Sequence, residues 1–368
     1  MKEGWEYKKL GEICDLYQPK TISTKEMVLD GLYDVFGANG KIGKYHSYNH
    51  EDSEILMTCR GATCGNINIS TPKSWINGNA MVVHIKDEEK LDMQFLVYSL
   101  INIDKSHIIT GAAQPQITRQ TLSPLQICFP SLSEQQSIVD YLDSAFAKID
   151  AMKANAEKAL NEAKALFQAS LKEMLEPKEG WEEKTLDDVC EIKSILVDPK
   201  EVQYKNLLHV GGANIVSETG ELIDLKTAAE EELSSGKFTF NDKDVLYNKI
   251  RPYLIKVSRP DFSGLCSADM YPLTSKKGMT RDYLYYILVS RDFTDYAIMN
   301  SARAGMPKLN RQTLFAYKCM IPPLSEQQTI VATLDSLKSK VDRLQANYDK
   351  ISQECDALKQ AILRQVFE

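Results

Sequence analysis

The chain has 368 residues, of which 43% are hydrophobic and 26% charged, so it is long enough for two domains with separate cores. Its net charge of −7 argues against a simple polycationic nucleic-acid binder, and any DNA contact must come from local patches. The N-terminus carries no apolar signal region, and no apolar run is long enough to cross a bilayer. These features predict a cytoplasmic protein without a membrane partner. The eight cysteines form no CxxC pair, so we expect reduced thiols and neither disulfides nor a metal site.

Two sequence repeats divide the chain into halves. The opening segment 3–14 returns as 179–190, which is 176 residues later. The segment 129–144, FPSLSEQQSIVDYLDS, returns as 321–336, IPPLSEQQTIVATLDS, which is 192 residues later. The borders of the two halves are therefore alike, whereas the residues between the borders diverge. A period this long indicates a duplicated domain with its connector, because solenoids repeat every 20 to 50 residues or so.

The connectors read as two long helices. Ser133 and Ser325 are each followed by Gln three residues later, with proline just before them, which is the capping-box signature of a helix start. Apolar or small residues then recur in alternating steps of four and three, the spacing of a coiled-coil seam. The predicted seam comprises Ile138, Leu142, Ala145, Ile149, Met152, Ala156, Ala159, Ala163 and Leu166 in the first helix and Ile330, Leu334, Leu337, Val341, Leu344, Tyr348, Ile351, Cys355 and Leu358 in the second.

These helices would leave an apolar stripe exposed if each stood alone. Small residues in the middle of the first helix, such as Ala156 and Ala163, match large ones in the middle of the second, such as Tyr348 and Ile351. We therefore expect the helices to pair antiparallel within one chain. The alternative is that each helix packs on its own globular domain or on a partner chain.

The globular parts read as mixed α/β, with short apolar strands near residues 53–58 and 244–248 and helices near 91–101 and 282–290. The expected fold class is α+β, with two α/β domains joined by two long helices that form an antiparallel intramolecular coiled coil with pseudo-two-fold symmetry. The expected segments are a domain over 1–130, a helix over 131–176, a domain over 177–322 and a helix over 323–368.

No catalytic constellation is evident in the sequence. Gly37–Lys44 resembles a phosphate-binding loop, but Ala38 and Tyr45 stand where a Walker A motif needs glycine and a hydroxyl residue. His46 and His50 lie four residues apart in a glycine-rich region without an HExxH motif, so a surface pair is the simpler reading. A duplicated scaffold without catalytic motifs favours a binding protein.

Polar and basic residues in the divergent interiors are the candidate DNA contacts. Arginine can pair with guanine, asparagine with adenine, and lysine with phosphate. The alternative for any one of them is an ordinary solvated loop. The candidates are Asn39, Lys41, Lys44, Thr58, Arg60 and Thr63 in the first half and Lys249, Arg251, Tyr253 and Lys256 in the second, with Arg259 close behind.

Taken together, the motifs resemble the specificity subunit of type I restriction-modification systems. They are the Gly-Trp-x-x-x-x-Leu starts at Gly4 and Gly180, the Gly-Met-Pro-Lys-Leu-Asn-Arg run at 305–311, and the two Leu-Ser-Glu-Gln-Gln helix starts. The resemblance covers essentially the whole chain. In two respects the chain departs from the pattern: it begins directly at the first recognition domain, and the two helix starts differ, Phe-Pro-Ser-Leu against Ile-Pro-Pro-Leu.

The resemblance implies a protein without catalysis of its own. Each target-recognition domain would bind one half of a bipartite, asymmetric site in double-stranded DNA, and the spacer helices would set the separation. Two methyltransferase subunits that use S-adenosylmethionine would dock on the helices and flip the target adenine. ATP- and Mg-dependent motor and nuclease subunits would join them, and this chain itself would bind no cofactor. The alternatives are a related system with a fused methyltransferase-nuclease partner, or a coiled-coil scaffold that does not bind DNA.

Overall fold

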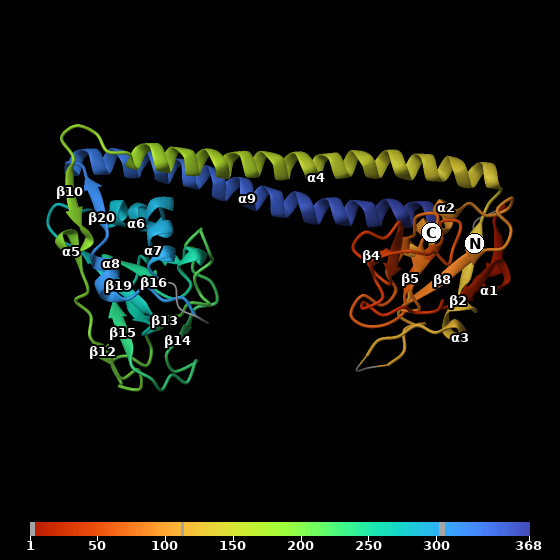
Figure 1. Cartoon of the computed structure of the whole chain (residues 1–368), viewed down its shortest axis with the longest axis horizontal. Coiled ribbons are helices and arrows are strands. Elements are labelled where there is room, and N and C mark those ends of the chain that lie inside the picture. The colour runs from red at the N-terminus through yellow and green to blue at the C-terminus, as the bar shows by residue number, and fades with distance from the viewer. Residues whose placement is uncertain (1–3, 112–113, 302–305) are drawn as a thin grey trace. The chain divides into compact units, whose positions relative to one another are not determined.

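The computed structural model describes residues 4–111, 114–301 and 306–368, and the chain forms two compact units. Unit 1 consists of residues 1–156 and 348–368, and unit 2 consists of residues 157–347. Each unit holds one globular domain, called domain 1 and domain 2 below, and a portion of each of two long helices (Figure 1). These helices are α4 (Leu132–Leu175) and α9 (Leu324–Phe367), with 44 residues each. Gly305 of the Gly-Met-Pro run lies outside the described residues.

Domain 1 combines small sheets with one substantial helix. An antiparallel sheet has the order β2 (Cys14–Tyr17), β8 (Ala80–Ile85), β5 (Ile55–Thr58), β6 (Ile67–Ile69). A second sheet has the order β4 (Gly40–Tyr45), β3 (Tyr33–Gly37), β7 (Trp75–Ile76). The domain is closed by the pair β1 (Glu6–Lys9) and β9 (Gln126–Phe129) and by helices α1 (Leu10–Ile13), α2 (Met93–Asn102) and α3 (Arg119–Leu122).

Domain 2 repeats this plan with a larger second sheet. The matching antiparallel sheet has the order β11 (Cys190–Glu191), β19 (Met270–Ser275), β16 (Asp244–Asn248), β17 (Val257–Ser258). The second sheet has the order β12 (Leu196–Val197), β15 (Lys237–Phe240), β18 (Gly264–Cys266), β13 (Leu208–Val210), β14 (Lys226–Thr227). The pair β10 (Glu182–Thr185) and β20 (Lys318–Ile321) closes the domain, with helices α5 (Leu186–Val189), α6 (Arg281–Val289), α7 (Arg291–Met299) and α8 (Arg311–Phe315) and the short 3-10 helix η1 (Pro252–Leu254). The sheets of the two domains thus differ most in the second sheet, which among the described residues has three strands in domain 1 and five in domain 2.

The two long helices do not begin at the predicted capping boxes. Helix α4 starts at Leu132 and α9 at Leu324, so Ser133 and Ser325 lie inside the first turn, where both are exposed. The prediction that these serines are N-caps is therefore wrong. The carbonyl of Ser131, the residue just before α4, accepts the first hydrogen bonds of the helix, so Ser131 and not Ser133 occupies the N-cap position.

The first glutamine of each Glu-Gln-Gln run anchors the start of its long helix, a role that the capping-box pattern did not predict. Gln135 is fully buried, and its Nε2 donates to the carbonyls of Pro130 (2.9 Å) and Lys90 (2.8 Å), while its Oε1 accepts from the backbone N–H of Asp92 (2.9 Å). Gln327 is equally buried and makes the same three bonds, to Pro322 (2.9 Å), Gly278 (2.8 Å) and Thr280 (2.9 Å). Asp92 and Thr280 are the N-caps of α2 and α6. Each glutamine thus ties the start of a long helix to the start of the main helix of its domain.

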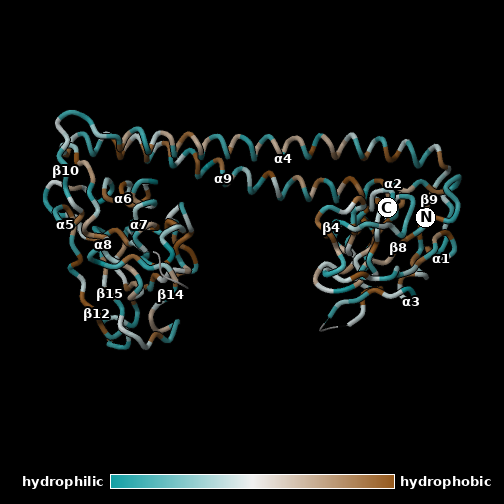
Figure 2. The backbone as a smooth tube through the Cα atoms, viewed as in Figure 1, coloured by the Kyte–Doolittle hydropathy of each residue, from teal (hydrophilic) through white to brown (hydrophobic). Residues whose placement is uncertain are grey.

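The intramolecular antiparallel pairing of the long helices is confirmed. In unit 1, Lys359 Nζ lies 2.6 Å from Asp150 Oδ1, and Lys153 Nζ lies 3.5 Å from Asp356 Oδ1, so numbers rise along one helix as they fall along the other. In unit 2, Lys164 Nζ donates to Gln345 Oε1 at 2.9 Å. Apolar residues recur along both helices (Figure 2).

The helix ends also pack on the domains, as the alternative reading proposed. The first turns of α4 contribute Ile138 to the core of domain 1, and those of α9 contribute Ile330 and Leu334 to the core of domain 2. The last turn of each helix packs on the other domain: Leu171 of α4 lies in the core of domain 2, and Phe367 of α9 packs on the core of domain 1. Both expected modes of burial therefore occur, each in a different part of the helices.

The predicted seam of α4 is correct up to Ile149 and only partly correct beyond it. Leu142 and Ile149 are buried and Ala156 is half-buried, but Met152 is 59% exposed and Leu166 60% exposed. Ala159 is exposed as well. Lys153, Leu160 and Phe167, each one residue later, are buried or half-buried in place of Met152, Ala159 and Leu166, whereas the predicted Ala156 and Ala163 are half-buried as expected.

The physical reason is that α4 carries apolar side chains in two adjacent phases. Leu160 is 3% exposed, and Phe167 packs on the core of domain 2, to which Leu171 also belongs. The set with Leu160 and Phe167 leads into the core of domain 2, so facing this set inward buries more apolar surface than facing Met152 and Leu166 inward would. In α9 the predicted Ile330, Leu334, Val341, Leu344 and Tyr348 are all buried or half-buried, whereas Leu358 is 47% exposed.

All eight cysteines carry free thiols, and five of them are buried. Within residues 4–111, 114–301 and 306–368, no group of three or more His, Cys, Asp or Glu side chains is arranged to hold a metal ion. None of the helices in this described part of the chain is both long enough and apolar enough to span a membrane.

Candidate nucleic-acid interface

Three predicted contact residues of domain 1 meet in one hydrogen-bonded cluster. Thr58, at the end of β5, is buried, and its hydroxyl bonds with the Ala38 carbonyl (2.8 Å) and with Asn39 Oδ1 (3.0 Å). Asn39 Nδ2 in turn donates to Thr63 Oγ1 at 2.8 Å. Asn39 and Thr63 are exposed, whereas the buried Thr58 positions the turn between β3 and β4. The cluster presents an amide and a hydroxyl in a fixed arrangement.

The basic residues of domain 1 differ in how freely they can reach a ligand. Lys41 is paired with Asp34, with 2.7 Å between Nζ and Oδ1. Arg60 is exposed, and its guanidinium has no hydrogen-bond or ion-pair partner among the described residues. Lys44 on β4 is exposed as well, and its ammonium has no hydrogen-bond or ion-pair partner in the described part of the chain. Arg60 and Lys44 are thus available for guanine or phosphate contacts.

A hollow of about 660 Å³ lies beside the Asn39 cluster. Amides can donate and accept at once, so they suit the edges of bases. Sequence reasoning included only Asn39 and Thr63 of its lining, although the alternation in Gly65-Asn-Ile-Asn-Ile69 could have signalled the others. The amides that line it are those of Asn39, Asn66, Asn68 and Gln360.

The predicted residues of domain 2 surround a strained turn. Arg251 and Ile255 flank η1 and have positive φ angles of 50° and 46°. A β-branched residue in this region is an outlier, and such strain clusters at functional sites. Arg251 and Tyr253 are both exposed on this turn.

Comparison of the two domains explains why the strain at Arg251 is informative. The backbone N–H of Arg251 donates to the Pro307 carbonyl (2.9 Å), and that of Gly61 donates to the Pro115 carbonyl (3.0 Å). Pro115 and Pro307 are repeat equivalents, and Gly61 also has a positive φ, of 86°. Domain 1 therefore has a glycine where domain 2 keeps an arginine despite the steric cost. The same alignment places Ile250 where domain 1 has Arg60, so the two interiors present different chemistry.

Three of the predicted basic contacts are engaged by the fold. Lys249 is only 8% exposed: its ammonium donates to the Ala268 carbonyl, lies 3.8 Å from Asp269 Oδ1 and 5.0 Å from the ring of Tyr271. Burial lowers its pKa. Lys256 Nζ donates to the Gly212 carbonyl. Arg259 lies between two carboxylates. Lys249, Lys256 and Arg259 are thus held by protein partners, which the sequence did not indicate because it shows their charge but not what they contact.

Comparison with known proteins agrees with this organisation. The family model described as "Type I restriction modification DNA specificity domain" matches residues 2–162 and again 178–353. The EcoDI specificity subunit of Escherichia coli is 28% identical over 400 residues, covering 99% of this chain and 88% of that protein. A putative type I specificity subunit of Mycoplasma pneumoniae, S.MpnORF507P, is 25% identical, covering 89% of this chain and 88% of that protein.

Solved structures show the same fold. A chain from a structure of the type I R-M system, described in terms of complex assembly and conformational transition, superposes with a TM-score of 0.74 at 18% identity, covering 100% of this chain and 98% of that one. The HsdS subunit from Thermoanaerobacter tengcongensis superposes with a TM-score of 0.52 at 18% identity, covering 100% and 97%. With two specificity-domain matches spanning most of its length, this chain belongs to the family of type I restriction-modification specificity subunits, the non-catalytic proteins that recognise DNA for the other subunits of the system.

Proposed function

We propose that the chain recognises a bipartite, asymmetric site in double-stranded DNA, with one half bound by each domain. The observation that carries this proposal is the difference between equivalent surfaces on a shared scaffold. Domain 1 offers Arg60, Asn39 and an amide-lined hollow, whereas domain 2 offers Arg251 and Tyr253 on a strained turn. Different donors and acceptors select different base edges. Two unlike half-sites follow.

In this proposal each candidate residue has a defined role. Asn39, Thr63, Arg60 and Arg251 contact base edges, Lys44 contacts phosphate, and Tyr253 packs against the sugar or base. Thr58, Lys249 and Lys256 support those contacts from within the domain, since their polar atoms bond with the protein. Lys41 supplies a charge that Asp34 partly neutralises.

The long helices are proposed to bind two methyltransferase subunits. Met152 and Leu166 of α4 stay exposed although they are large and apolar, which is consistent with a surface that a partner covers. The methyltransferase subunits would bring S-adenosylmethionine, and motor and nuclease subunits would bring ATP and Mg. Because the chain carries a net charge of −7, such partners would complete the neutralisation of the phosphates.

The test is to co-express the chain with its cognate methyltransferase subunit and to map methylated adenines across the host genome. The expected result is one motif with two different half-sites at a fixed spacing. A palindromic motif, or methylation that does not depend on the chain, would contradict the proposal. Retention of DNA with the mapped motif, but not of scrambled DNA, by the purified complex would exclude a scaffold that does not bind DNA.

A further inference from the structure

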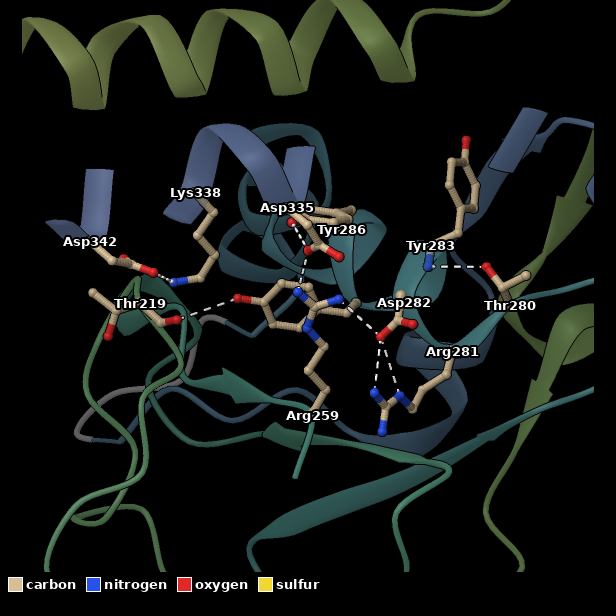
Figure 3. A network of polar contacts seen from close by, with 11 residues as sticks. Thr219, Arg259, Thr280, Arg281, Asp282, Tyr283, Tyr286, Asp335, Lys338 and Asp342 are labelled. Atoms are coloured by element: carbon tan, nitrogen blue, oxygen red, sulfur yellow. Dashed lines mark hydrogen bonds and ion pairs between the residues drawn. The ribbon is translucent and has the colours of Figure 1, made fainter. Parts of the chain in front are cut away.

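Unit 2 contains an ionic junction that joins domain 2 to helix α9. The junction consists of Arg259, Asp282, Asp335 and Tyr286, which Figure 3 labels, together with Tyr285. Arg259 follows strand β17, Asp282 and the two tyrosines lie on α6, and Asp335 lies on α9. Three elements that are distant in sequence thus converge on one guanidinium, whose side chain is 22% exposed.

The geometry of the junction fixes the guanidinium in two directions. Arg259 Nη1 donates to Asp282 Oδ1 at 2.9 Å, and Nη2 donates to Asp335 Oδ1. The rings of Tyr285 and Tyr286 lie 4.7 Å and 5.5 Å from the guanidinium carbon. Asp335 Oδ1 accepts a second bond, from the hydroxyl of Tyr286 at 2.5 Å. Asp282 holds one arm of the planar guanidinium within domain 2, so the other arm is aimed at Asp335 with little freedom to rotate. Turning the domain on α9 would break the Arg259–Asp335 ion pair and the Tyr286–Asp335 bond together.

Unit 1 has the tyrosine–aspartate contact of this junction but lacks its arginine and its second aspartate. The hydroxyl of Tyr98 donates to Asp143, and these residues are the equivalents of Tyr286 and Asp335. The position of Arg259 is taken by Ile69, since strands β6 and β17 pair with β5 and β16 in the same register. Gln94 stands in place of Asp282, the second residue of the matching helix. Ile69 is 37% exposed.

We infer that Arg259 is a positioning residue that fixes the orientation of domain 2 on the spacer helix, and that domain 1 is held less firmly and accommodates variation in target spacing. This inference rests on the proposed function, because spacing has a meaning only for a bipartite target. Both domains also contact the long helices through apolar residues and through a buried glutamine. Beyond those contacts, domain 1 has one tyrosine hydroxyl bond, which persists over a range of angles, whereas domain 2 adds the arginine fork, which does not. Domain 2 therefore keeps its distance to the other half-site more strictly than domain 1 does.

The loss test replaces Arg259 in the complex with its methyltransferase. R259M keeps the length of the side chain without the fork, and R259K retains one charge-assisted bond. The readout is the methylation rate on targets with native half-sites and a spacer one base pair shorter or longer, relative to the native spacer. We expect this ratio to rise about tenfold in R259M and less in R259K, with unchanged base preference in both half-sites; a tenfold change corresponds to about 1.4 kcal/mol.

The gain test builds the junction into domain 1. The double substitution I69R and Q94D places an arginine and an aspartate at the equivalent positions beside Asp143. We expect the ratio for altered spacers to fall below that of the wild type. Y286F and Y98F form a matched pair, in which Y286F is expected to raise the ratio more, because only Asp335 also holds the arginine.

The outcomes separate this inference from the proposed function. An unchanged spacer ratio in R259M that folds and recognises both half-sites would overturn the inference alone. If R259M does not fold, Y286F and the double variant I69R and Q94D test the inference in its place. A raised methylation ratio for altered spacers in Y286F and a lowered ratio in the double variant support the inference. Ratios equal to that of the wild type in both overturn it. A wild-type chain that selects no bipartite target would overturn the proposed function and this inference with it.

Discussion

Arg251 is the residue at which backbone and function conflict most directly. Its φ of 50° falls where its equivalent in domain 1 is Gly61, with a φ of 86°. A side chain at such a position costs free energy that glycine would avoid. The exposed guanidinium offers no compensating contact within the described residues, which makes a contact with a ligand the simplest reason for its presence.

Arg251→Gly is therefore expected to separate folding from recognition. The free energy of unfolding should stay within about 1 kcal/mol of the wild-type value or rise, because strain is relieved. Discrimination at one base of the second half-site should fall by about 1 to 3 kcal/mol if the side chain reads guanine. Urea denaturation and binding to a panel of single-base variants measure the two effects.

Arg60→Ala is the matched control in domain 1 and should relax one base of the first half-site only. If the arginine holds phosphate instead, binding to all sequences would weaken alike and the salt dependence would become less steep. A loss of discrimination in the half-site of the other domain would contradict the assignment of domains to half-sites.

Gln135 and Gln327 predict a stability effect that their neighbours should not show. Replacing Gln135 by leucine leaves the Asp92 N–H and the carbonyls of Lys90 and Pro130 without their partner, at a cost of about 1 to 3 kcal/mol for a buried group that stays unsatisfied. The adjacent Gln136 is exposed, so Gln136→Leu should change stability by less than about 0.5 kcal/mol. Thermal unfolding of the two variants tests this, and equal shifts would argue against the role of the buried amide.

At the scale of elements, the long helices were predictable because their pattern repeats many times. The steps of three and four identified α4 and α9 and most of the seam of α9. The phase of α4 after Ile149 was not predictable, because Met152 and Leu166 compete with Leu160 and Phe167 for the same role. Only the position of the core of domain 2, which receives Leu171, decides between them.

Two substitutions check the observed phase. Leu160→Ala should destabilise unit 2 by about 2 kcal/mol or more, because a side chain that is 3% exposed is lost from the packed face. Met152→Ala should change the free energy of unfolding by less than about 0.5 kcal/mol, since Met152 is 59% exposed. Denaturation of the chain without partners distinguishes the two, and the reverse order would restore the phase predicted from sequence.

At the scale of the whole molecule, the shared borders and divergent interiors make the domains separable modules. Exchanging residues 15–113 for the matching interior of another family member should change one half-site and leave the other half-site and the spacing unchanged. The physical reason is that the attachment of the domain survives the exchange. The strand pair of β1 and β9 lies outside the exchanged segment, and Gln135 contacts only backbone atoms within it. Methylation mapping provides the readout, and a change in both half-sites would contradict modular recognition.

Lengthening both helices tests whether they set the spacing. An insertion of seven residues after Ala156 and after Asn347, at the borders of the two units, preserves the heptad seam and adds about 10 Å to each helix. At about 3.4 Å per base pair, the gap between half-sites should grow by roughly three base pairs with the bases unchanged. An unaltered gap would show that the helices are not the determinant of spacing.

The sequence by itself determined the duplication, the two helices, the α/β character of the domains and the family, because each depends on local patterns or on residues repeated along the chain. Tertiary structure decided which residues those patterns use. It buries Gln135, Lys249 and Arg259 against partners far away in sequence, and it selects Leu160 over Met152 as a seam residue. Such choices depend on the relative burial and pairing of whole elements, which no local spacing of residues records.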